Sequence, residues 1–306
     1  MKVIRAGILG FCSGVRRAVD LALNESSTAE HPVYTLGPLI HNSRVLSDLK
    51  GRGIVMLEEG EFPPPGANTI VIIRAHGVPL AMERELRRLG CKVIDATCPH
   101  VKASQKKAAF FSGKGYTIFL AGEENHAEII SLHSYAAEDK CFVVADPEEA
   151  EAAALKSLGV KAALPKTALI GQTTISPGEY KAIGERLRSY LPDLEVVNTI
   201  CGATMERQEA LKELMPQVDA VVIAGCRDSA NARRLLSIAL ETGKKAWLVE
   251  SANGILPEAF TFSVIGLSAG ASTPDETICE IEQALLASHG EHQEHSGQTL
   301  RSKEKQ

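Results

Sequence analysis

The sequence contains no motif that binds a nicotinamide dinucleotide or a nucleoside triphosphate. Two glycine pairs, Gly51/Gly53 and Gly113/Gly115, lack the third glycine and the strand–turn–helix setting of a dinucleotide-binding fingerprint. There is also no G-x-x-x-x-G-K-[ST] phosphate loop, no H-E-x-x-H zinc motif and no G-x-S-x-G nucleophile motif. The chain therefore carries no nicotinamide or ATP signature of its own.

Long apolar runs and a strong net charge are absent as well. The longest apolar runs, such as residues 220–224, are far too short to span a bilayer. The formal net charge of −5 gives no general attraction to nucleic acid or to an acidic membrane, so an anionic ligand must be held by local groups. Near the N-terminus Arg5 interrupts the few apolar residues, and no apolar core of a signal peptide follows. We expect a cytoplasmic protein with neither a membrane nor a nucleic acid as its partner.

The chain has no C-x-x-C pair, and its seven cysteines are an odd number. Both facts argue against a disulfide framework and against zinc-ribbon or thioredoxin chemistry. Three of the other four cysteines, Cys91, Cys141 and Cys279, lie in or beside apolar or strand-like runs, where free cysteine usually acts as a small hydrophobic residue. The fourth, Cys226, lies in a polar loop, and the sequence assigns it no role.

Cys12, Cys98 and Cys201 share one sequence context. Each follows a short β-like run and precedes small or turn-forming residues that open a helix-like segment. A thiol at a helix N-terminus feels the positive end of the helix dipole, which favours the thiolate, the form that binds metals. Three such thiolates predict a metal site that lacks a fourth protein ligand, and an open position on a metal is where chemistry occurs.

Short apolar runs alternate with helical patterns, which is typical of an α/β fold with parallel sheets covered on both faces. The clearest helix begins near Val15, and a second follows Cys201 and ends at Pro216. The expected strands are residues 3–9, 70–73, 92–95, 117–120, 142–144, 168–170, 195–197, 220–224, 246–249 and 263–265.

The chain length and the cysteine spacing indicate how the domains are organised. A chain of 306 residues is long enough for about two domains or three small ones. The three cysteines are 86 and 103 residues apart, and each interval holds several strand–helix units. We therefore expect three similar α/β modules at residues 1–97, 98–199 and 200–285, each contributing one cysteine. Residues 286–306 are rich in polar side chains without periodicity, which predicts a disordered tail.

Polar segments follow five of the expected strands. They begin at Arg74, Gly122, Gly171, Gly225 and Ser268. Ligands of parallel α/β proteins bind beyond the carboxyl ends of the strands, so these segments predict one shared cavity. Each residue also has a structural explanation when it is taken alone, since serine and asparagine commonly cap helices and single histidines are often structural. The prediction therefore depends on their coincidence at one edge.

Nine short segments of the chain resemble the 4-hydroxy-3-methylbut-2-enyl diphosphate reductase family. They occur in the family's order between about residues 1 and 285. The segments are G-F-C-S-G-V (10–15), G-P-L-I-H-N (37–42), R-A-H-G-V (74–78), D-A-T-C-P (95–99), H-A-E (126–128), Q-T-T (172–174), I-C-G-A-T-M-E-R-Q-E-A (200–210), S-A-N (229–231) and A-G-A-S (269–272).

The resemblance implies a trefoil of three α/β modules around a central [4Fe–4S] cluster. It implies that Cys12, Cys98 and Cys201 are the metal ligands and that one iron carries no protein ligand. The implied reaction is reductive dehydroxylation of the diphosphate substrate to isopentenyl and dimethylallyl diphosphate, with two electrons and two protons consumed and water released. The substrate hydroxyl would bind the open iron. The electron donor would be an external protein of the ferredoxin or flavodoxin type.

The resemblance also implies roles for side chains of the polar segments. Glu128, Thr173 and His126 match the catalytic group, in which Glu128 delivers protons and Thr173 helps to hold the substrate oxygen. The residues that match the substrate-binding set are His41, His76, His126, Thr173, Ser229, Ala230, Asn231 and Ser272. Ala230 stands where related sequences have a second serine, so one hydroxyl contact to the diphosphate is missing. A bound diphosphate should favour the doubly protonated histidines.

Two other classes of function stay open. A zinc-dependent phosphoester hydrolase would use the same histidine, cysteine and glutamate side chains but would contain no acid-labile sulfide. An iron–sulfur sensor or electron carrier would need no cluster of histidines and hydroxyls, and would not bind a diphosphate.

Overall fold

This computed structural model describes residues 1–28, 31–58, 60–159 and 166–287. The chain divides into two compact units, which are described separately. The first unit comprises Met1–Cys12, His41–Ser43 and Ala203–Gln306, and the second comprises Ser13–Ile40 and Arg44–Gly202. The described residues form three four-stranded sheets, one in the first unit and two in the second, and every strand pair is parallel.

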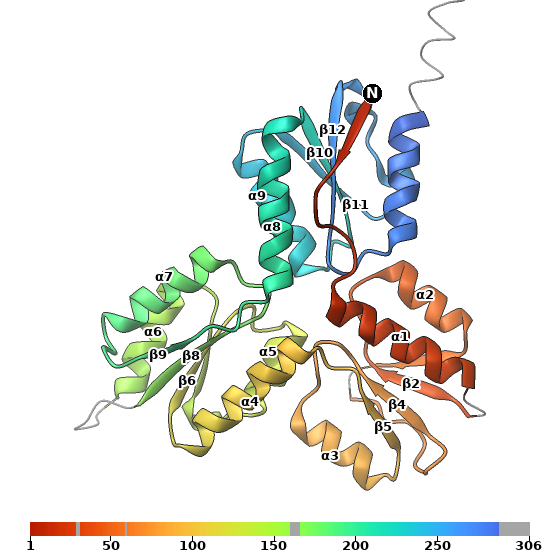
Figure 1. The fold of residues 1–306 in the computed structure, drawn as a ribbon. Helices are drawn as coiled ribbons and strands as arrows, with labels where there is room; N and C mark the ends of the chain where they lie inside the picture. Colours follow the sequence, from red (N-terminus) through yellow and green to blue (C-terminus); the bar gives the residue numbers. More distant parts are fainter. Residues whose placement is uncertain (29–30, 59, 160–165, 288–306) are drawn as a thin grey trace, which may run out of the picture. The chain divides into compact units, whose positions relative to one another are not determined.

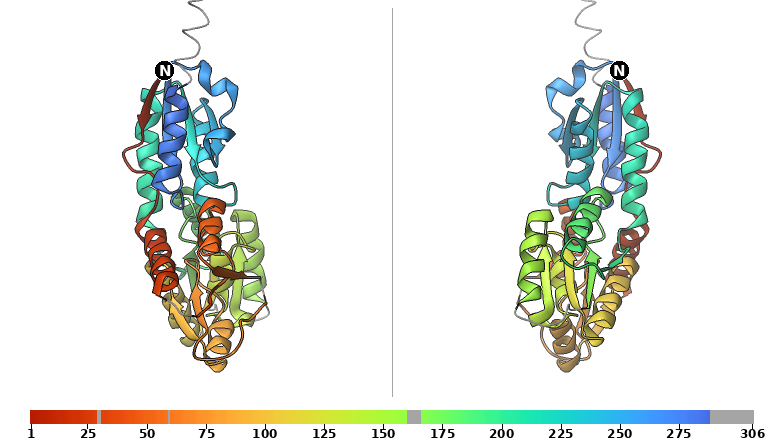
Figure 2. Two further views of the ribbon diagram at one scale, coloured as in Figure 1. Left: turned by 90° about the vertical axis from the view of Figure 1, so that its right-hand side faces the viewer. Right: turned by 90° about the vertical axis from the view of Figure 1, so that its left-hand side faces the viewer.

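The sheet of the first unit has the strand order β1-β12-β10-β11. Its strands are β1 (Lys2–Arg5), β12 (Val264–Ala269), β10 (Ala220–Ala224) and β11 (Lys245–Val249). The helices of this unit are α8 (Gly202–Leu214), whose first residue lies in the second unit, α9 (Ala230–Glu241) and a helix of residues 275–287. Figure 1 shows α8 and α9 on one side of the sheet and the helix of residues 275–287 on the other. The two views of Figure 2 face these opposite sides in turn.

Strand β10 shows why its sequence is apolar throughout. Val221 and Ile223 pack in a cluster with residues of α8 and α9. Ala220, Val222 and Ala224 pack in a second cluster that includes Ile278 and Ile281 of the other helix. Successive side chains of a strand point to opposite faces, so a strand covered on both faces needs an apolar residue at every position.

The first sheet of the second unit has the order β3-β2-β4-β5. Its strands are β3 (Ile54–Leu57), β2 (Val33–Leu36), β4 (Ile70–Ile73) and β5 (Lys92–Asp95), and its helices are α1 (Ser13–Thr28), α2 (Ser43–Gly51), whose first residue lies in the first unit, and α3 (Leu80–Arg88). Val71 and Ile73 pack in one cluster with Leu86 of α3. Figure 1 shows α1 and α2 on the opposite side of the sheet from α3.

The second sheet of this unit has the order β7-β6-β8-β9. Its strands are β7 (Cys141–Val144), β6 (Thr117–Ala121), β8 (Thr167–Gly171) and β9 (Glu195–Val197), and its helices are α4 (Pro99–Gly113), α5 (Ala127–His133), α6 (Pro147–Leu158) and α7 (Pro177–Arg188). Phe119 packs with residues of α6 and α7, whereas its neighbours Ile118 and Leu120 pack with residues of α4 and α5. Short 3-10 helices occupy Glu138–Lys140, Met215–Gln217, Ala252–Gly254 and Pro257–Thr261.

The three sheets repeat one strand order. Read from the edge that carries no predicted metal ligand, the orders are β3-β2-β4-β5, β7-β6-β8-β9 and β11-β10-β12-β1. The strand at the opposite edge leads in each case to a cysteine, since β5 precedes Cys98, β9 precedes Cys201 and β1 precedes Cys12. In the first unit this edge strand comes from the beginning of the chain. Residues 2–5 therefore pair with residues 264–267.

The α/β class and the parallel sheets expected from the sequence are confirmed. The strand expected at residues 3–9 is shorter and ends at Arg5, and strands β2 and β3 were not expected. The module boundaries at residues 97/98 and 199/200 stay a prediction. The last helix continues to residue 287, and residues 288–306 of the expected polar tail lie outside the described residues.

Candidate active site

Each of the three predicted metal ligands donates its backbone N–H to the loop that follows the neighbouring strand. The bonds run from Cys12 to the carbonyl of Ala271 (3.0 Å), from Cys98 to that of Ala75 (2.8 Å) and from Cys201 to that of Thr173 (2.8 Å). These carbonyls belong to the A-G-A-S, R-A-H-G-V and Q-T-T segments. One hydrogen bond in each sheet thus ties a cysteine to a segment that carries predicted site residues.

The three cysteines also share their position relative to a helix. Cys98 is the N-cap residue of α4, with Pro99 in the first turn, and its side chain makes no capping hydrogen bond. Cys12 directly precedes α1, and Cys201 directly precedes α8. All three are half-buried and none forms a disulfide. The donor set is therefore three thiols at helix N-termini, which suits thiolate binding to iron or zinc.

The surroundings of two of the other cysteines disfavour the thiolate form. Burial raises the pKa of the Cys141 thiol to about 12. Burial also raises the pKa of the Cys226 thiol, although the backbone N–H of Asp228 opposes the rise. The Cys226 sulfur lies 3.9 Å from the carboxylate of Asp228, so its surroundings are acidic. These environments fit structural cysteines better than metal ligands.

The predicted histidines and hydroxyl residues follow the two middle strands of each sheet. The loops after β2, β6 and β10 begin with glycines whose N–H groups bond the last residue of the edge strand, at 2.9–3.0 Å. They carry His41, His126 with Glu128, and Ser229 with Ala230 and Asn231. The loops after β4, β8 and β12 carry His76, Thr173 and Ser272. The topology thus places all predicted site residues at the carboxyl ends of the strands, as expected for a parallel α/β protein.

Glu128 and Thr173 form the most tightly bonded pair among these residues. The backbone N–H and the hydroxyl of Thr173 each donate to one carboxylate oxygen of Glu128, both at 2.8 Å. Glu128 is 1% exposed and Thr173 is 6% exposed. Burial raises the pKa of Glu128 to about 7, and the two hydrogen bonds from Thr173 limit the rise. Because the Thr173 carbonyl accepts from Cys201, the pair is also tied to a predicted metal ligand.

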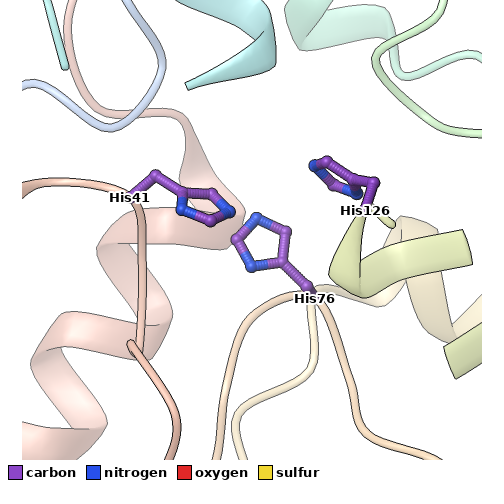
Figure 3. A group of neighbouring side chains, drawn as sticks. All are labelled: His41, His76 and His126. Atoms are coloured by element: carbon purple, nitrogen blue, oxygen red, sulfur yellow. The ribbon is translucent and has the colours of Figure 1, made fainter. Parts of the chain in front are cut away.

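His76 and His126 lie close together in the second unit. Their rings are perpendicular, with centroids 5.4 Å apart (Figure 3). His126 is the N-cap of α5, and its Nδ1 accepts the N–H of Glu128 at 3.1 Å. A nitrogen that accepts a hydrogen bond carries no proton, so Nε2 is the donor of this ring.

In the first unit, three of the predicted substrate-binding residues, Ser229, Ala230 and Asn231, lie at the N-terminus of α9. The Ser229 side chain accepts the N–H of Ala232 and so caps the helix. The hydroxyl of Ser272 donates to the backbone carbonyl of His41 at 3.0 Å. Asn231 is 4% exposed, and neither side-chain amide atom has a hydrogen-bond partner among the described residues. A buried amide without a partner is costly, so this side chain fits a site that receives a polar ligand.

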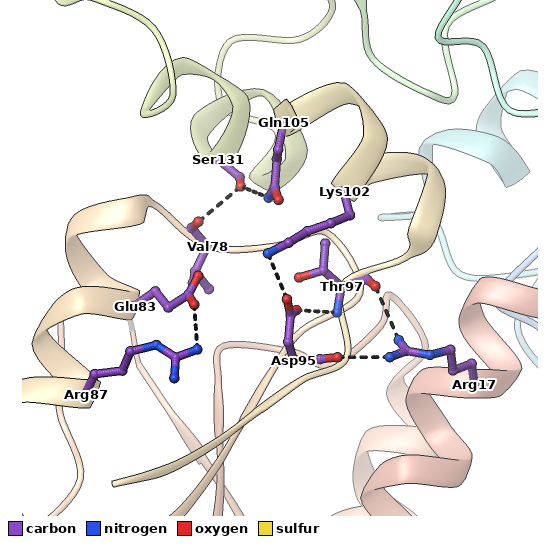
Figure 4. A network of polar contacts seen from close by, with 9 residues as sticks. All are labelled: Arg17, Val78, Glu83, Arg87, Asp95, Thr97, Lys102, Gln105 and Ser131. Carbon is purple, nitrogen blue, oxygen red and sulfur yellow. Dashed lines mark hydrogen bonds and ion pairs between the residues drawn. The ribbon is translucent and has the colours of Figure 1, made fainter. Parts of the chain in front are cut away.

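Sequence reasoning missed several polar side chains that hold the loops of the site. The carboxylate of Asp95 accepts the backbone N–H of Thr97 at 3.0 Å and lies 2.8 Å from the amine of Lys102. Buried Gln105 donates to Ser131, whose hydroxyl donates to the carbonyl of Val78, two residues after His76 (Figure 4). Arg17 and Arg207 bond backbone carbonyls close to cysteines. The partners of these side chains include backbone atoms, which leave no pattern in the sequence.

A sequence model of the family described as "LytB protein" matches residues 3–286. The chain is 47% identical over 291 residues to the 4-hydroxy-3-methylbut-2-enyl diphosphate reductase of Treponema denticola. This alignment covers 94% of this chain and 99% of that protein. The corresponding reductase of Aquifex aeolicus is 37% identical over 92% of this chain and 95% of its own length.

Solved structures of reductases with this activity have the same fold. The Plasmodium falciparum enzyme aligns with a TM-score of 0.84 and 25% sequence identity, covering 92% of this chain and 87% of that one. A second structure, titled as (E)-4-hydroxy-3-methyl-but-2-enyl diphosphate reductase, the terminal enzyme of the non-mevalonate pathway, aligns with a TM-score of 0.68 and 37% identity. It covers 94% of this chain and 100% of the other chain.

Among the described residues, every helix is too short or too polar to cross a membrane. Both the sequence match over almost the whole chain and the shared fold point to one group of enzymes. The chain belongs to the LytB family of 4-hydroxy-3-methylbut-2-enyl diphosphate reductases.

Proposed function

We propose that the protein reduces 4-hydroxy-3-methylbut-2-enyl diphosphate to isopentenyl diphosphate and dimethylallyl diphosphate. Two electrons and two protons enter, the carbon–oxygen bond of the hydroxyl group breaks, and one water molecule leaves. The observation that carries this proposal is the buried pair of Glu128 and Thr173, tied through a carbonyl to Cys201. It places a carboxyl group that retains a proton near neutral pH beside a predicted metal ligand.

The proposed cofactor is a [4Fe–4S] cluster held by Cys12, Cys98 and Cys201. Support comes from the donor set, since three thiols occupy equivalent positions at helix N-termini and iron–sulfur clusters are held by thiolates. When bound, the cluster would pass the two electrons of an external donor to the substrate and would offer a Lewis-acidic iron to its hydroxyl group.

The side chains of this chain hold the proton and the substrate. Glu128 would store a proton on a fully buried side chain, and Thr173 orients the carboxyl group through two hydrogen bonds. The diphosphate would bind the side-chain amide of Asn231, which has no hydrogen-bond partner among the described residues, and the N-terminus of α9, where the helix dipole favours an anion. His41, His76, His126, Ser229 and Ser272 complete the proposed binding set. Ala230 offers only its backbone N–H at the position of the missing serine.

The electrons must come from another protein, because the chain has no dinucleotide fingerprint. A small one-electron carrier of the ferredoxin or flavodoxin type fits this need.

The decisive experiment is anaerobic purification followed by iron and sulfide analysis and an assay with substrate and a chemical reductant. The expected protein is brown and active, and each of Cys12→Ser, Cys98→Ser and Cys201→Ser loses both the cluster and turnover. The matched control is Cys91→Ser, which changes a thiol outside the proposed ligand set and should keep both. A colourless, iron-free protein that is active would contradict the proposal. Zinc without acid-labile sulfide would instead favour a metal-dependent hydrolase.

A further inference from the structure

Two arginine side chains hold the backbone next to two of the cysteines. Arg17 lies on α1, the helix that begins after Cys12. It donates to the carbonyls of Thr97 (3.3 Å) and Asp95 (3.1 Å), which lie one and three residues before Cys98 (Figure 4). Arg207 lies on α8, the helix that begins after Cys201. It donates from Nε and Nη2 to the carbonyl of Gly10, at 3.1 and 2.7 Å.

The two contacts follow one rule. An arginine in the second turn of the helix after one cysteine bonds carbonyl groups one to three residues before another cysteine. The planar guanidinium group carries several N–H donors in a fixed fork, so it can hold two carbonyls, or one carbonyl twice, without freedom to rotate. Lysine places a single rotatable ammonium group there and cannot reproduce this geometry.

Arg207 is the more strongly held of the two. It is 4% exposed, and its Nη1 also donates to the carbonyl of Ala203 on its own helix at 2.8 Å. Hydrogen bonds from a buried charged donor are roughly twice as strong as those between neutral groups. The bonds of Arg17 are longer and part of its side chain is exposed, so its hold on the carbonyls should be weaker.

The held segments also have contacts of their own. Gly10 is buried with a φ of +79°, and a Cβ atom there would lie 2.9 Å from the Ile278 side chain, whereas the space around Gly7 is open. The N–H of Cys12 also bonds the carbonyl of Ala271. The segment before Cys98 is anchored by the bonds of Ala96 and Cys98 to the loop after β4.

We propose that Arg207 and Arg17 are positioning residues that fix the backbone of the Cys12 and Cys98 segments before the cofactor binds. This inference rests on the proposed function, because it takes these cysteines as ligands of the cluster. Ligands on separate loops must be ordered when a metal centre forms, and loops that are already fixed lose less entropy in that step.

Hydrogen exchange of the cluster-free protein, kept reduced without air, tests the positioning directly. Arg207→Gln should raise the exchange rate of the Cys12 amide about tenfold and leave Ala96 and Cys98 unchanged. Arg17→Gln should give the opposite pattern with a smaller increase. The matched control is Lys212→Gln, since Lys212 lies on the same helix as Arg207 but pairs only with Glu209 at the surface. It should change neither segment.

Reconstitution with iron and sulfide supplies the second readout. Bound iron and the visible absorption of the cluster should fall in Arg207→Gln and recover partly in Arg207→Lys, because lysine keeps the charge and one donor. If Arg207→Gln does not fold, Arg207→Lys should still show an intermediate increase in exchange at Cys12.

The outcomes separate this inference from the proposed function. Exchange that is unchanged at the held segments, or that rises equally over the whole chain, overturns the positioning role, even if the wild-type protein binds iron and sulfide. A wild-type protein that binds neither iron nor sulfide overturns the proposed function and the link to the cofactor. The exchange pattern then still decides whether the arginines hold the segments.

Discussion

Glu128 is subject to two opposing effects on its pKa. Full burial favours the neutral acid, whereas the N–H and hydroxyl of Thr173 favour the carboxylate. The balance is a pKa of about 7, so the side chain exchanges its proton near neutral pH. A group with this property can both store and release a proton.

The variant Glu128→Gln should keep its cluster and lose turnover by at least about 100-fold, the usual contribution of a general acid. Gln preserves the shape of the side chain but holds no transferable proton. Wild-type activity should fall as the pH rises above about 7, because the carboxyl group then ionises. The assay with a chemical reductant measures both effects. The matched control is Glu124→Gln, which changes an exposed carboxylate in the same loop and should keep full activity.

Stability measurements check the pKa independently of turnover. The pKa in the folded protein, about 7, lies above its ordinary value of 4.5. The folded protein therefore binds more protons than the unfolded chain between these values, and ionisation of Glu128 lowers stability as the pH rises through this window. Relative to wild type, Glu128→Gln should gain stability between pH 4.5 and 7 in urea titrations of the cluster-free protein. A stability difference between the two proteins that does not vary with pH in this range would show that Glu128 is already ionised in the folded protein.

Gly77 is the residue for which a methyl group has least room beside the site. Its φ is +76°, and a Cβ atom would lie 2.4 Å from Nε2 of Gln105 and 2.8 Å from the hydroxyl of Ser131. Those two atoms bond each other, so one of them must move and the bond must break. We expect Gly77→Ala to lower the free energy of unfolding by about 2 to 3 kcal/mol, from backbone strain plus one lost buried bond.

Chemical denaturation of Gly77→Ala measures this loss, and Gly53→Ala is its control. Gly53 has a φ of +83° but nothing lies within 4 Å of the added methyl group, so only the backbone strain remains, about 1 kcal/mol. An equal decrease in the free energy of unfolding in both variants would mean that moving Gln105 or Ser131 has no energetic cost.

The residues of the site differ in how far the sequence reveals them. The residue type alone indicates the chemistry of cysteine, histidine and glutamate. Their positions after strands predict that they lie at the same edge of the sheets. Arg17 and Arg207 could not be found in this way, because their partners are backbone carbonyls that any residue can supply. The burial of Glu128, which sets its pKa, depends on packing between segments that are far apart in the sequence.

At the scale of the element, Tyr180 joins α7 to two strands. Its hydroxyl lies 2.9 Å from the carbonyl of Leu169 on β8 and 2.6 Å from that of Val197 on β9. Strand β9 leads to Cys201, so this contact holds the strand that precedes a proposed metal ligand. Tyr180 is 6% exposed, and water cannot easily replace the hydroxyl.

Tyr180→Phe should therefore lower the free energy of unfolding by about 1 to 2 kcal/mol, since a buried carbonyl loses its donor. Denaturant titration of the cluster-free protein measures the change. Tyr190→Phe is the matched control, because this hydroxyl bonds Glu151 near the surface, where water can replace it. A larger loss for Tyr190→Phe than for Tyr180→Phe would contradict this account.

Strand prediction succeeded for the strands that are covered on both faces and also for some that are not. Strands β6, β8 and β10 are buried at every position, and most of their residues are apolar. Strands β5 and β9 are partly exposed but are also expected from the sequence. Strand β3 was missed because its position at the edge of the sheet leaves Val55 and Met56 45% and 51% exposed. Strand β2 was missed because Tyr34 and Thr35 interrupt its apolar pattern. An apolar run is the local signal of a strand, and polar residues can hide a strand even where it is largely buried, as in β2.

At the scale of the whole molecule, the strand order explains how three cysteines come to follow equivalent edge strands of three similar sheets. In the second unit each cysteine strand follows a helix, as in β4-α3-β5 and β8-α7-β9. In the first unit β12 is also followed by a helix, at residues 275–287, but the strand beside β12 is β1. This sheet is therefore a circular permutation of the other two. No local pattern could predict the pairing, because it joins the first strand of the chain to the last.

A permuted chain tests this relation. It would begin at Ser13 and carry residues 1–12 after residue 287, joined by a flexible Gly/Ser linker of about ten residues that spans on average about 17 Å. We expect it to fold, because the register of β1 with β12 and the bond from Cys12 to Ala271 do not depend on the order of the segments. The new connection should cost on the order of 1 kcal/mol in loop entropy. Circular dichroism and urea titration measure fold and stability.

The control is a permuted chain opened between Val222 and Ile223, inside the fully buried strand β10, which should not fold cooperatively. Opening at Cys12 also separates this cysteine from α1, whose Arg17 holds the segment before Cys98. The permuted chain should therefore keep the protection of the β1 amides against hydrogen exchange, because that protection comes from β12. Rapid exchange of the β1 amides in an otherwise folded permuted chain would show that β1 needs its covalent link to α1 to stay in the sheet.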